Sequence, residues 1–152
     1  MTIEVKNVDE MISFGHIIGL SLCGGEIIEL IGDVGSGKTT LVKGIALGLG
    51  IDEYIQSPSF TINRVYTGRD HIILSHYDFY RLPNAGIMAN DLQEVIGDPR
   101  TVTIIEWAGV VDGVLPIDRL SISIATLTET SRKIIISAGG TTSQKLKDKM
   151  NK

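Results

Sequence analysis

The most constraining feature of the sequence is a glycine-rich octapeptide, Gly32 to Thr39, which reads Gly-Asp-Val-Gly-Ser-Gly-Lys-Thr. It has the spacing G-x-x-x-x-G-K-[ST] of a phosphate-binding loop. An apolar run, residues 27–31, precedes it, and residues 40–47 behind it carry apolar side chains at helical spacing. A buried strand that leads through a glycine-rich loop into a helix is the geometry this motif requires. The octapeptide therefore predicts a phosphate site at the start of a helix.

The residue types of this loop suit the chemistry of a triphosphate. Gly32, Gly35 and Gly37 can take positive φ and let backbone N–H groups approach phosphate oxygens. The helix N-terminus adds unpaired N–H donors and about half a positive charge. Lys38 supplies a charge for the β- and γ-phosphates, and the Thr39 hydroxyl is placed to hold Mg²⁺.

Length and composition set the limits of what else the chain can be. With 152 residues, 43% hydrophobic and 21% charged, it has the size and balance of one globular domain. A net charge of −4 argues against tight autonomous binding of RNA or DNA. The lone Cys23 indicates a reducing compartment, and no signal peptide or membrane-crossing stretch is evident. We therefore expect a cytoplasmic protein without membrane contact.

Apolar periodicity predicts the other elements. A helix is expected over residues 8–22, although Gly15 and Gly19 weaken that prediction. The helix after the loop should end near residues 48–50, and a capping box at residues 90–93 predicts a short helix that ends near Gly97. Further strands are predicted at residues 60–66, 72–77, 102–105, 120–125 and 133–137.

This order predicts an α/β fold of the P-loop NTPase type. Alternating strands and helices favour a mostly parallel sheet flanked by helices. The last two strands have no helix between them, so antiparallel edge strands are expected near the C-terminus. We expect a single domain over residues 1–140. The polar, lysine-rich residues 141–152 are expected to form a flexible tail.

Two of the predicted strands end in a carboxylate, Asp78 and Glu106. In this architecture the carboxyl ends of the strands converge on the ligand crevice. Either acid alone could merely cap a turn, but two of them in a chain with a phosphate loop favour a functional role. Glu106 is predicted to belong to the Mg²⁺ shell, directly or through water. Asp78 is predicted to orient or activate an attacking water.

Other residues near these acids have competing interpretations. Residues 57–61 form a Ser/Pro-rich loop that either senses a γ-phosphate or is an ordinary turn. His76 and its aromatic neighbours are adequately explained as a half-buried strand end. Arg81 fits a structural ion pair better than an arginine finger. Trp107 either packs in the core or belongs to an interaction surface.

Four segments, in this order and spacing, resemble the TsaE (YjeE) family. Its members are bacterial P-loop ATPases required to make threonylcarbamoyladenosine in tRNA. The resemblance covers nearly the whole chain, from about residue 8 to residue 136. The phosphate loop is shared with many families, whereas the string 76–82 together with Glu106-Trp107 is far more selective. The four segments are residues 32–40, 57–61, 76–82 and 106–107.

The resemblance implies that the chain binds ATP and Mg²⁺ and hydrolyses ATP weakly. Lys38 and Asp78 would act in catalysis, and Thr39 and Glu106 would hold Mg²⁺. By position, Val8 and Ser131, beside Arg132, correspond to contacts that the family makes outside the loop. The implied nucleotide-binding residues are Val8, Val34, Gly35, Ser36, Gly37, Lys38, Thr39, Thr40, Asp78 and Ser131.

The resemblance also implies partners. The family acts with the TsaD–TsaB pair, which carries the threonylcarbamoyl transfer to N6 of the adenosine next to the anticodon. ATP hydrolysis is expected to support turnover of that pair, and tRNA is met only indirectly through the complex. Three positions depart from the family pattern: Met11 and Ser59 stand where threonine is frequent, and Ala108 stands where proline is usual.

Two other functions remain open on the residues alone. A small-molecule kinase could use the same loop, but Arg64, Arg69 and Arg81 are scattered and no lid-length insertion is evident. A nucleotide-dependent switch without significant hydrolysis is the second alternative, because a positioned Asp78 serves either purpose. The chain contains no Asn-Lys-x-Asp string for reading guanine, which weakly favours ATP.

Overall fold

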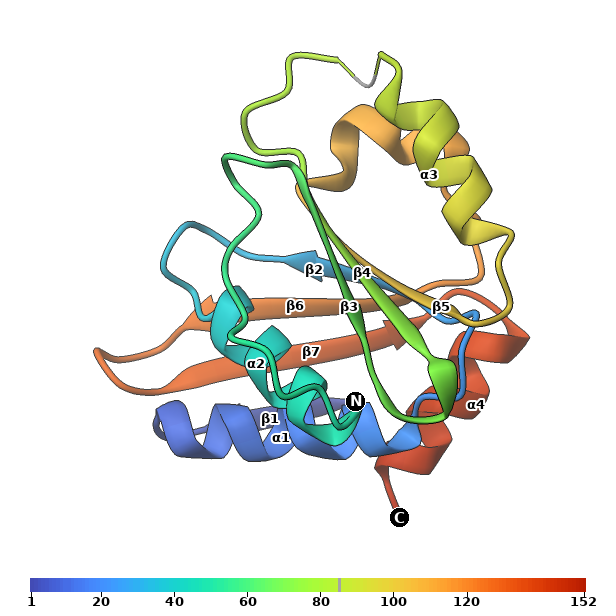
Figure 1. The fold of residues 1–152 in the computed structure, drawn as a ribbon. Helices are drawn as coiled ribbons and strands as arrows, with labels where there is room; N and C mark the ends of the chain where they lie inside the picture. Colours follow the sequence, from blue (N-terminus) through green and yellow to red (C-terminus); the bar gives the residue numbers. More distant parts are fainter. Residues whose placement is uncertain (85) are drawn as a thin grey trace.

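A seven-stranded sheet organises the molecule, with strand order β1-β7-β6-β2-β5-β4-β3 (Figure 1). The computed structural model describes residues 1–84 and 86–152. The four central strands run parallel, and antiparallel strands close both edges. The strands are β1 (Thr2–Val5), β2 (Ile27–Ile31), β3 (Asn63–Thr67), β4 (Ile73–Asp78), β5 (Thr101–Glu106), β6 (Leu120–Thr126) and β7 (Arg132–Ala138).

Helices cover the two faces of this sheet unequally (Figure 1). Three helices pack with the larger core on one face, and α3 with the 3-10 segment η2 packs with a smaller core on the other. The predicted α/β fold with a parallel centre and antiparallel strands near the C-terminus is confirmed. The helical elements are α1 (Val8–Ser21), α2 (Lys38–Gly48), η1 (Arg69–His71), α3 (Met88–Ile96), η2 (Ala108–Val114) and α4 (Thr141–Met150).

Glycines set the contact between α1 and α2. A Cβ atom on Gly15 would lie 2.5 Å from the Leu41 carbonyl oxygen and 2.8 Å from the Cα of Gly44. A Cβ on Gly19 would likewise lie 2.8 Å from the Cα of Gly48. These distances are too short for any side chain, so the two backbones meet directly. The glycines that weakened the predicted helix are therefore the residues that let it pack against α2.

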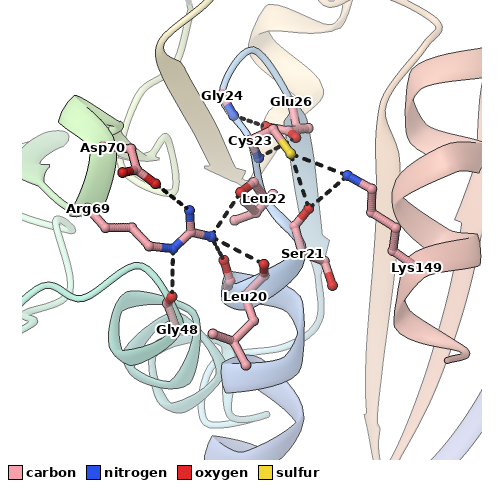
Figure 2. A network of polar contacts seen from close by, with 11 residues as sticks. Leu20, Ser21, Leu22, Cys23, Gly24, Glu26, Gly48, Arg69, Asp70 and Lys149 are labelled. Carbon is pink, nitrogen blue, oxygen red and sulfur yellow. Dashed lines mark hydrogen bonds and ion pairs between the residues drawn. The ribbon is translucent and has the colours of Figure 1, made fainter.

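Arg69 ties the ends of the same two helices together (Figure 2). Its guanidinium donates to the carbonyl oxygens of Leu20 and Leu22 at 3.2 and 3.0 Å and to that of Gly48 at 3.4 Å. These carbonyls lie at helix ends, where backbone acceptors lack intrahelical donors. Arg69 thus has a structural role at the ends of α1 and α2.

The C-terminal segment differs from the flexible tail predicted for residues 141–152. Its first ten residues form α4, and Leu146 is buried against the larger core. The Asp118 carboxylate accepts hydrogen bonds from the backbone N–H groups of Thr142 and Ser143, both at 2.9 Å, and from the Ser143 hydroxyl at 2.7 Å. These bonds lower the pKa of Asp118 to about 2. Asp118, distant in the sequence, thus caps the N-terminus of α4, because the N-cap residue Gly140 has no side chain to do so.

Several boundaries also differ from the sequence prediction. Helix α3 begins at Met88, ahead of the capping box predicted at residues 90–93, and no side chain caps it. Strand β3 begins at Asn63 rather than at residue 60, because Ile62 takes a left-handed conformation with φ 69°. The short edge strand β1 and both 3-10 segments were not predicted. No helix among the described residues is long and apolar enough to cross a membrane.

Candidate nucleotide site

The glycine-rich loop joins the end of β2 to the start of α2, as the sequence predicted. Gly35 and Gly37 have φ values of 81° and 109°, in the left-handed region that favours glycine. Gly37 directly precedes the first helical residue, Lys38. The backbone N–H groups of the first turn of α2 thus point toward the loop, which is the arrangement that binds anions at helix N-termini.

A cavity of about 270 Å³ opens beside this loop, at the carboxyl ends of the parallel strands. It brings the loop together with both acids predicted from the strand ends. We call it the strand-end cavity. Its lining consists of Val34, Gly35, Gly37, Lys38, Thr39, Thr40, Ser59, Asp78, Tyr80, Glu106 and Trp107.

The two acids converge because their strands are neighbours. Asp78 and Glu106 are direct partners in the parallel pairing of β4 with β5. Asp78 is 5% exposed, and its two carboxylate oxygens accept hydrogen bonds from the Tyr80 N–H at 2.9 Å and the Ser59 hydroxyl at 2.8 Å. The Ser57 hydroxyl lies 2.9 Å from that of Ser59. The Ser/Pro loop is therefore joined to Asp78, which the sequence left undecided.

Glu106 lines the cavity and is contacted by a residue outside the lining. Its carboxylate is 2% exposed, and Oε2 lies 3.2 Å from Nε2 of His76, which is fully buried. Sequence reasoning assigned His76 to an ordinary strand end and missed this contact. The alternation of side chains along β4 indicates that His76 shares one face of the strand with Asp78, but it does not identify Glu106 on β5 as the partner.

Lys38 and Trp107 line the same cavity as the two acids. The Lys38 ammonium donates to the carbonyl oxygens of Gly32 and Asp33, the latter at 3.1 Å. It also lies 5.0 Å from the centroid of the Trp107 ring, which packs 4.9 Å from the Tyr80 ring. Trp107 has φ 57° and ψ 51°, an uncommon left-handed conformation for a bulky residue. Such backbone strain concentrates at functional sites.

A second cavity, of about 380 Å³, lies on the other side of the loop. We call it the N-terminal cavity, because the start of α1 supplies much of its lining. Gly35, Gly37 and Thr40 belong to both cavities, so the loop separates them. The lining consists of Asn7, Val8, Asp9, Met11, Gly35, Ser36, Gly37, Thr40, Glu129, Thr130 and Arg132.

Val8 and Ser131, the nucleotide contacts predicted at the two ends of the chain's resemblance, differ in their relation to this cavity. Val8 lines the N-terminal cavity and is 62% exposed. Ser131 does not line it: this residue is buried, and its hydroxyl lies 2.6 Å from that of Thr128. Its neighbours Thr130 and Arg132 line the cavity instead. Arg132 Nε donates to the Ser36 carbonyl oxygen at 2.9 Å, which fixes the β6–β7 turn beside the phosphate loop.

The donor set of the strand-end cavity fits Mg²⁺. A threonine hydroxyl and a carboxylate, Thr39 and Glu106, line one space. Mg²⁺ is usually bound by one or two carboxylates together with substrate phosphates and waters, rather than by a cage of protein ligands. No group of three or more His, Cys, Asp or Glu side chains suited to a metal occurs in the part of the chain that the structure describes.

Neither Arg81 nor Arg64 lines the strand-end cavity. The Arg81 guanidinium lies 4.6 Å from the ring centroid of Phe60, an aromatic residue that is 84% exposed. Among the described residues Arg81 forms no ion pair, so its structural partner is an aromatic ring rather than the carboxylate that the sequence suggested. Arg64 lies on the edge strand β3, outside the linings of both cavities.

A glycine-rich loop between a parallel strand and a helix, facing two acids at neighbouring strand ends, defines a P-loop NTPase-like α/β protein. The family model described as threonylcarbamoyl adenosine biosynthesis protein TsaE matches residues 5–134. The chain belongs to this family, which takes part in the biosynthesis of threonylcarbamoyladenosine in tRNA.

Individual relatives agree with this assignment. A tRNA threonylcarbamoyladenosine biosynthesis protein TsaE from Treponema pallidum is 35% identical over 131 residues, covering 86% of this chain and 96% of the relative. The protein of the same name from Bacillus subtilis is 37% identical over 122 residues, covering 76% and 72%. The crystal structure of Bacillus subtilis YdiB has a TM-score of 0.83 and 30% identity, covering 99% of this chain and 93% of that one.

Proposed function

We propose that this protein hydrolyses Mg-ATP weakly, as an accessory subunit in the formation of threonylcarbamoyladenosine in tRNA. One observation carries the proposal: a single cavity unites the Lys-Thr end of the phosphate loop with Asp78 and Glu106. Binding phosphates requires only the loop, whereas hydrolysis also requires an acid near the metal and a group that places water. We assign these two roles to Glu106 and Asp78, which both line the strand-end cavity.

Each residue of the site has a proposed role that follows from its chemistry. Lys38 would contact the β- and γ-phosphates, exchanging its present carbonyl partners for phosphate oxygens. Thr39 and Glu106 would hold Mg²⁺, which supplies neutralisation of the charge on the phosphates. The backbone from Val34 to Thr40 would cradle the phosphates with its N–H groups.

Asp78 is the residue we assign to the attacking water. Its carboxylate is held from two sides, by Ser59 and by the N–H of Tyr80. A carboxylate fixed in this way can accept a hydrogen bond from water in one orientation, which is the role of a water-positioning residue.

The N-terminal cavity is suited to the nucleoside. Its lining includes the apolar side chains of Val8 and Met11 and the polar turn residues Glu129 and Thr130. Apolar surfaces accommodate the faces of a purine, and a few polar groups fix its orientation. Because the loop glycines border both cavities, one ATP could place its base in this cavity and its γ-phosphate in the other.

The partners that we propose are the TsaD and TsaB proteins, with ATP hydrolysis supporting their turnover and tRNA bound only by the complex. The family assignment supports this part of the proposal. So do the exposed apolar and aromatic residues near the strand-end cavity, Val34, Phe60 and Tyr80. Exposed aromatic side chains of this kind are enriched at protein interfaces.

Phosphate release from Mg-ATP tests the proposed function. We expect little release by the purified protein alone and a clear rise when the TsaD–TsaB pair is added. The Lys38→Ala variant with the pair is the control for contaminating ATPases. Equal release with and without the pair would separate this protein from that complex and favour a small-molecule phosphate acceptor.

A nucleotide-dependent switch is the second candidate, and a specific contact favours it. The Ser57, Ser59 and Asp78 side chains form a continuous chain of hydrogen bonds from the Ser/Pro loop into the cavity. A γ-phosphate beside Asp78 could therefore reorder this loop without being cleaved. If Asp78→Asn abolishes ATP hydrolysis but still supports tRNA modification by the TsaD–TsaB pair, nucleotide binding rather than hydrolysis is the function.

A further inference from the structure

His76 is a buried polar residue that the proposed function does not use. It lies on β4, and none of its surface is accessible to solvent. Its Nε2 atom is 3.2 Å from Oε2 of Glu106, while its Nδ1 atom is buried without a hydrogen-bond partner among the described residues. Because Nε2 faces a carboxylate oxygen, the proton belongs on Nε2, which then donates.

The sheet itself fixes this contact. His76 pairs with Ile104 on β5, and Asp78 pairs with Glu106 two residues further along. His76, Asp78 and Glu106 therefore project from one face of adjoining strands, and the imidazole reaches the carboxylate diagonally. A contact built on two central strands holds its geometry more closely than one made by a loop.

Packing alone does not account for a histidine at this position. Leu74, on the same face of β4, is equally buried and has no polar atom to satisfy. A buried nitrogen without a partner destabilises the folded state. The orphaned Nδ1 thus points to a role for the other nitrogen, and the carboxylate of Glu106 is its partner.

We propose that His76 is a positioning residue for Mg²⁺, acting through Glu106. The Nε2–H group engages Oε2, and Oε1 would be the carboxylate oxygen available to the metal. Without the imidazole the buried carboxylate would lose this donor and turn among several orientations. Donors behind a metal-binding carboxylate commonly change metal affinity by about 10–100-fold when they are removed. This inference rests on the proposed Mg-ATP site.

A pair of amide substitutions tests it. In His76→Gln the side-chain amide nitrogen can lie near the position of Nε2, whereas in His76→Asn the shorter chain cannot reach Glu106. The readout is binding of a non-hydrolysable ATP analogue as Mg²⁺ is titrated. It can be followed by the fluorescence of Trp107, the one tryptophan of the chain. Binding of the analogue in EDTA and thermal unfolding are measured alongside.

We expect His76→Asn to raise the Mg²⁺ concentration for half-saturation by about 10–100-fold, and His76→Gln to stay within about threefold of the native protein. Both should bind the analogue normally in EDTA. Equal shifts in the two variants, or a weakened Gln variant that is fully folded, would overturn the proposal. Absence of any Mg²⁺ dependence in the native protein would instead contradict the proposed function.

A second measurement does not depend on the folding of a variant. The chain has three histidines, His16, His71 and His76. Adding Mg²⁺ to the protein with bound analogue should shift the imidazole nitrogen resonances of His76 in an NMR spectrum. The resonances of His16 and His71 should stay in place. An unmoved His76 signal, with Mg²⁺ bound, would contradict the inference.

Discussion

The two cavities beside the phosphate loop are built in different ways. The strand-end cavity takes Asp78 and Glu106 from paired strands, so hydrogen bonds of the sheet set their spacing. The N-terminal cavity combines the start of α1 with the β6–β7 turn, which lie just beyond the ends of the paired strands β1 and β7. The glycine contact of α1 with α2 and the Arg132 contact with the loop also hold this lining in place. The acids of the strand-end cavity thus lie on the paired strands themselves, whereas the N-terminal cavity depends in addition on the packing of a helix and a turn.

Asp78→Asn should give the largest effect, at the strand-end cavity. The substitution keeps the shape but removes the charge, so one of the two donors from Ser59 and Tyr80 loses its acceptor. Loss of a group that acts on the attacking water typically lowers turnover by about 10²–10⁴-fold. We expect this loss with near-normal ATP affinity, as measured by stimulated phosphate release and by equilibrium binding. Unchanged turnover would remove Asp78 from the catalytic role.

Lys38→Ala should weaken binding rather than turnover alone. A charge-assisted contact to phosphate is worth roughly 1.5–3 kcal/mol. ATP affinity should therefore fall by about one to two orders of magnitude. Lys43→Ala is the matched control, because Lys43 lies on the same helix with its ammonium 5.5 Å from the Tyr54 ring centroid, outside both linings. Normal ATP affinity in Lys38→Ala would refute the loop assignment.

Gly44→Ala tests the packing that supports the N-terminal cavity. Its Cβ would meet the carbonyl oxygen of Ile12 and lie 2.9 Å from the Cα of Gly15, both backbone atoms. Overpacking of this kind costs about 1–3 kcal/mol of unfolding free energy. We expect that loss in denaturant unfolding, together with weaker ATP binding as the start of α1 moves from the loop.

Gly113→Ala is the control for this change. A Cβ on Gly113 meets none of the described atoms within 4 Å, and its φ is not positive. Its stability should change by no more than about 0.5 kcal/mol. Equal stability of both alanine variants would show that the glycine contact does not govern the placement of α1.

Asp118→Ala should give the smallest effect, far from both cavities. It removes the cap of α4, which is worth about 1 kcal/mol. Because the folded pKa of Asp118 is lowered from 3.8 to about 2, the stabilisation is present above pH 4 and is lost as the pH falls toward 2. The stability difference between native and variant protein should shrink over that range, while ATP binding at neutral pH stays unchanged. A difference independent of pH would contradict the cap.

The contrast between the cavities also explains what the sequence could predict. The loop and the two acids are local signals: each follows an apolar strand, and parallel strands end together. The places of Asn7, Asp9 and Glu129 in the N-terminal lining depend on contacts between segments that are far apart in the sequence. The same holds for α4, whose cap comes from Asp118, and for His76, whose partner lies on another strand. Local patterns cannot show such partners.

The most direct test is a crystal structure with Mg²⁺ and a non-hydrolysable ATP analogue. We predict the γ-phosphate and metal in the strand-end cavity, with Thr39 and Glu106 beside Mg²⁺, and the adenine in the N-terminal cavity between α1 and the β6–β7 turn. A nucleotide confined to one cavity, or a metal away from Glu106, would contradict the single site that we propose.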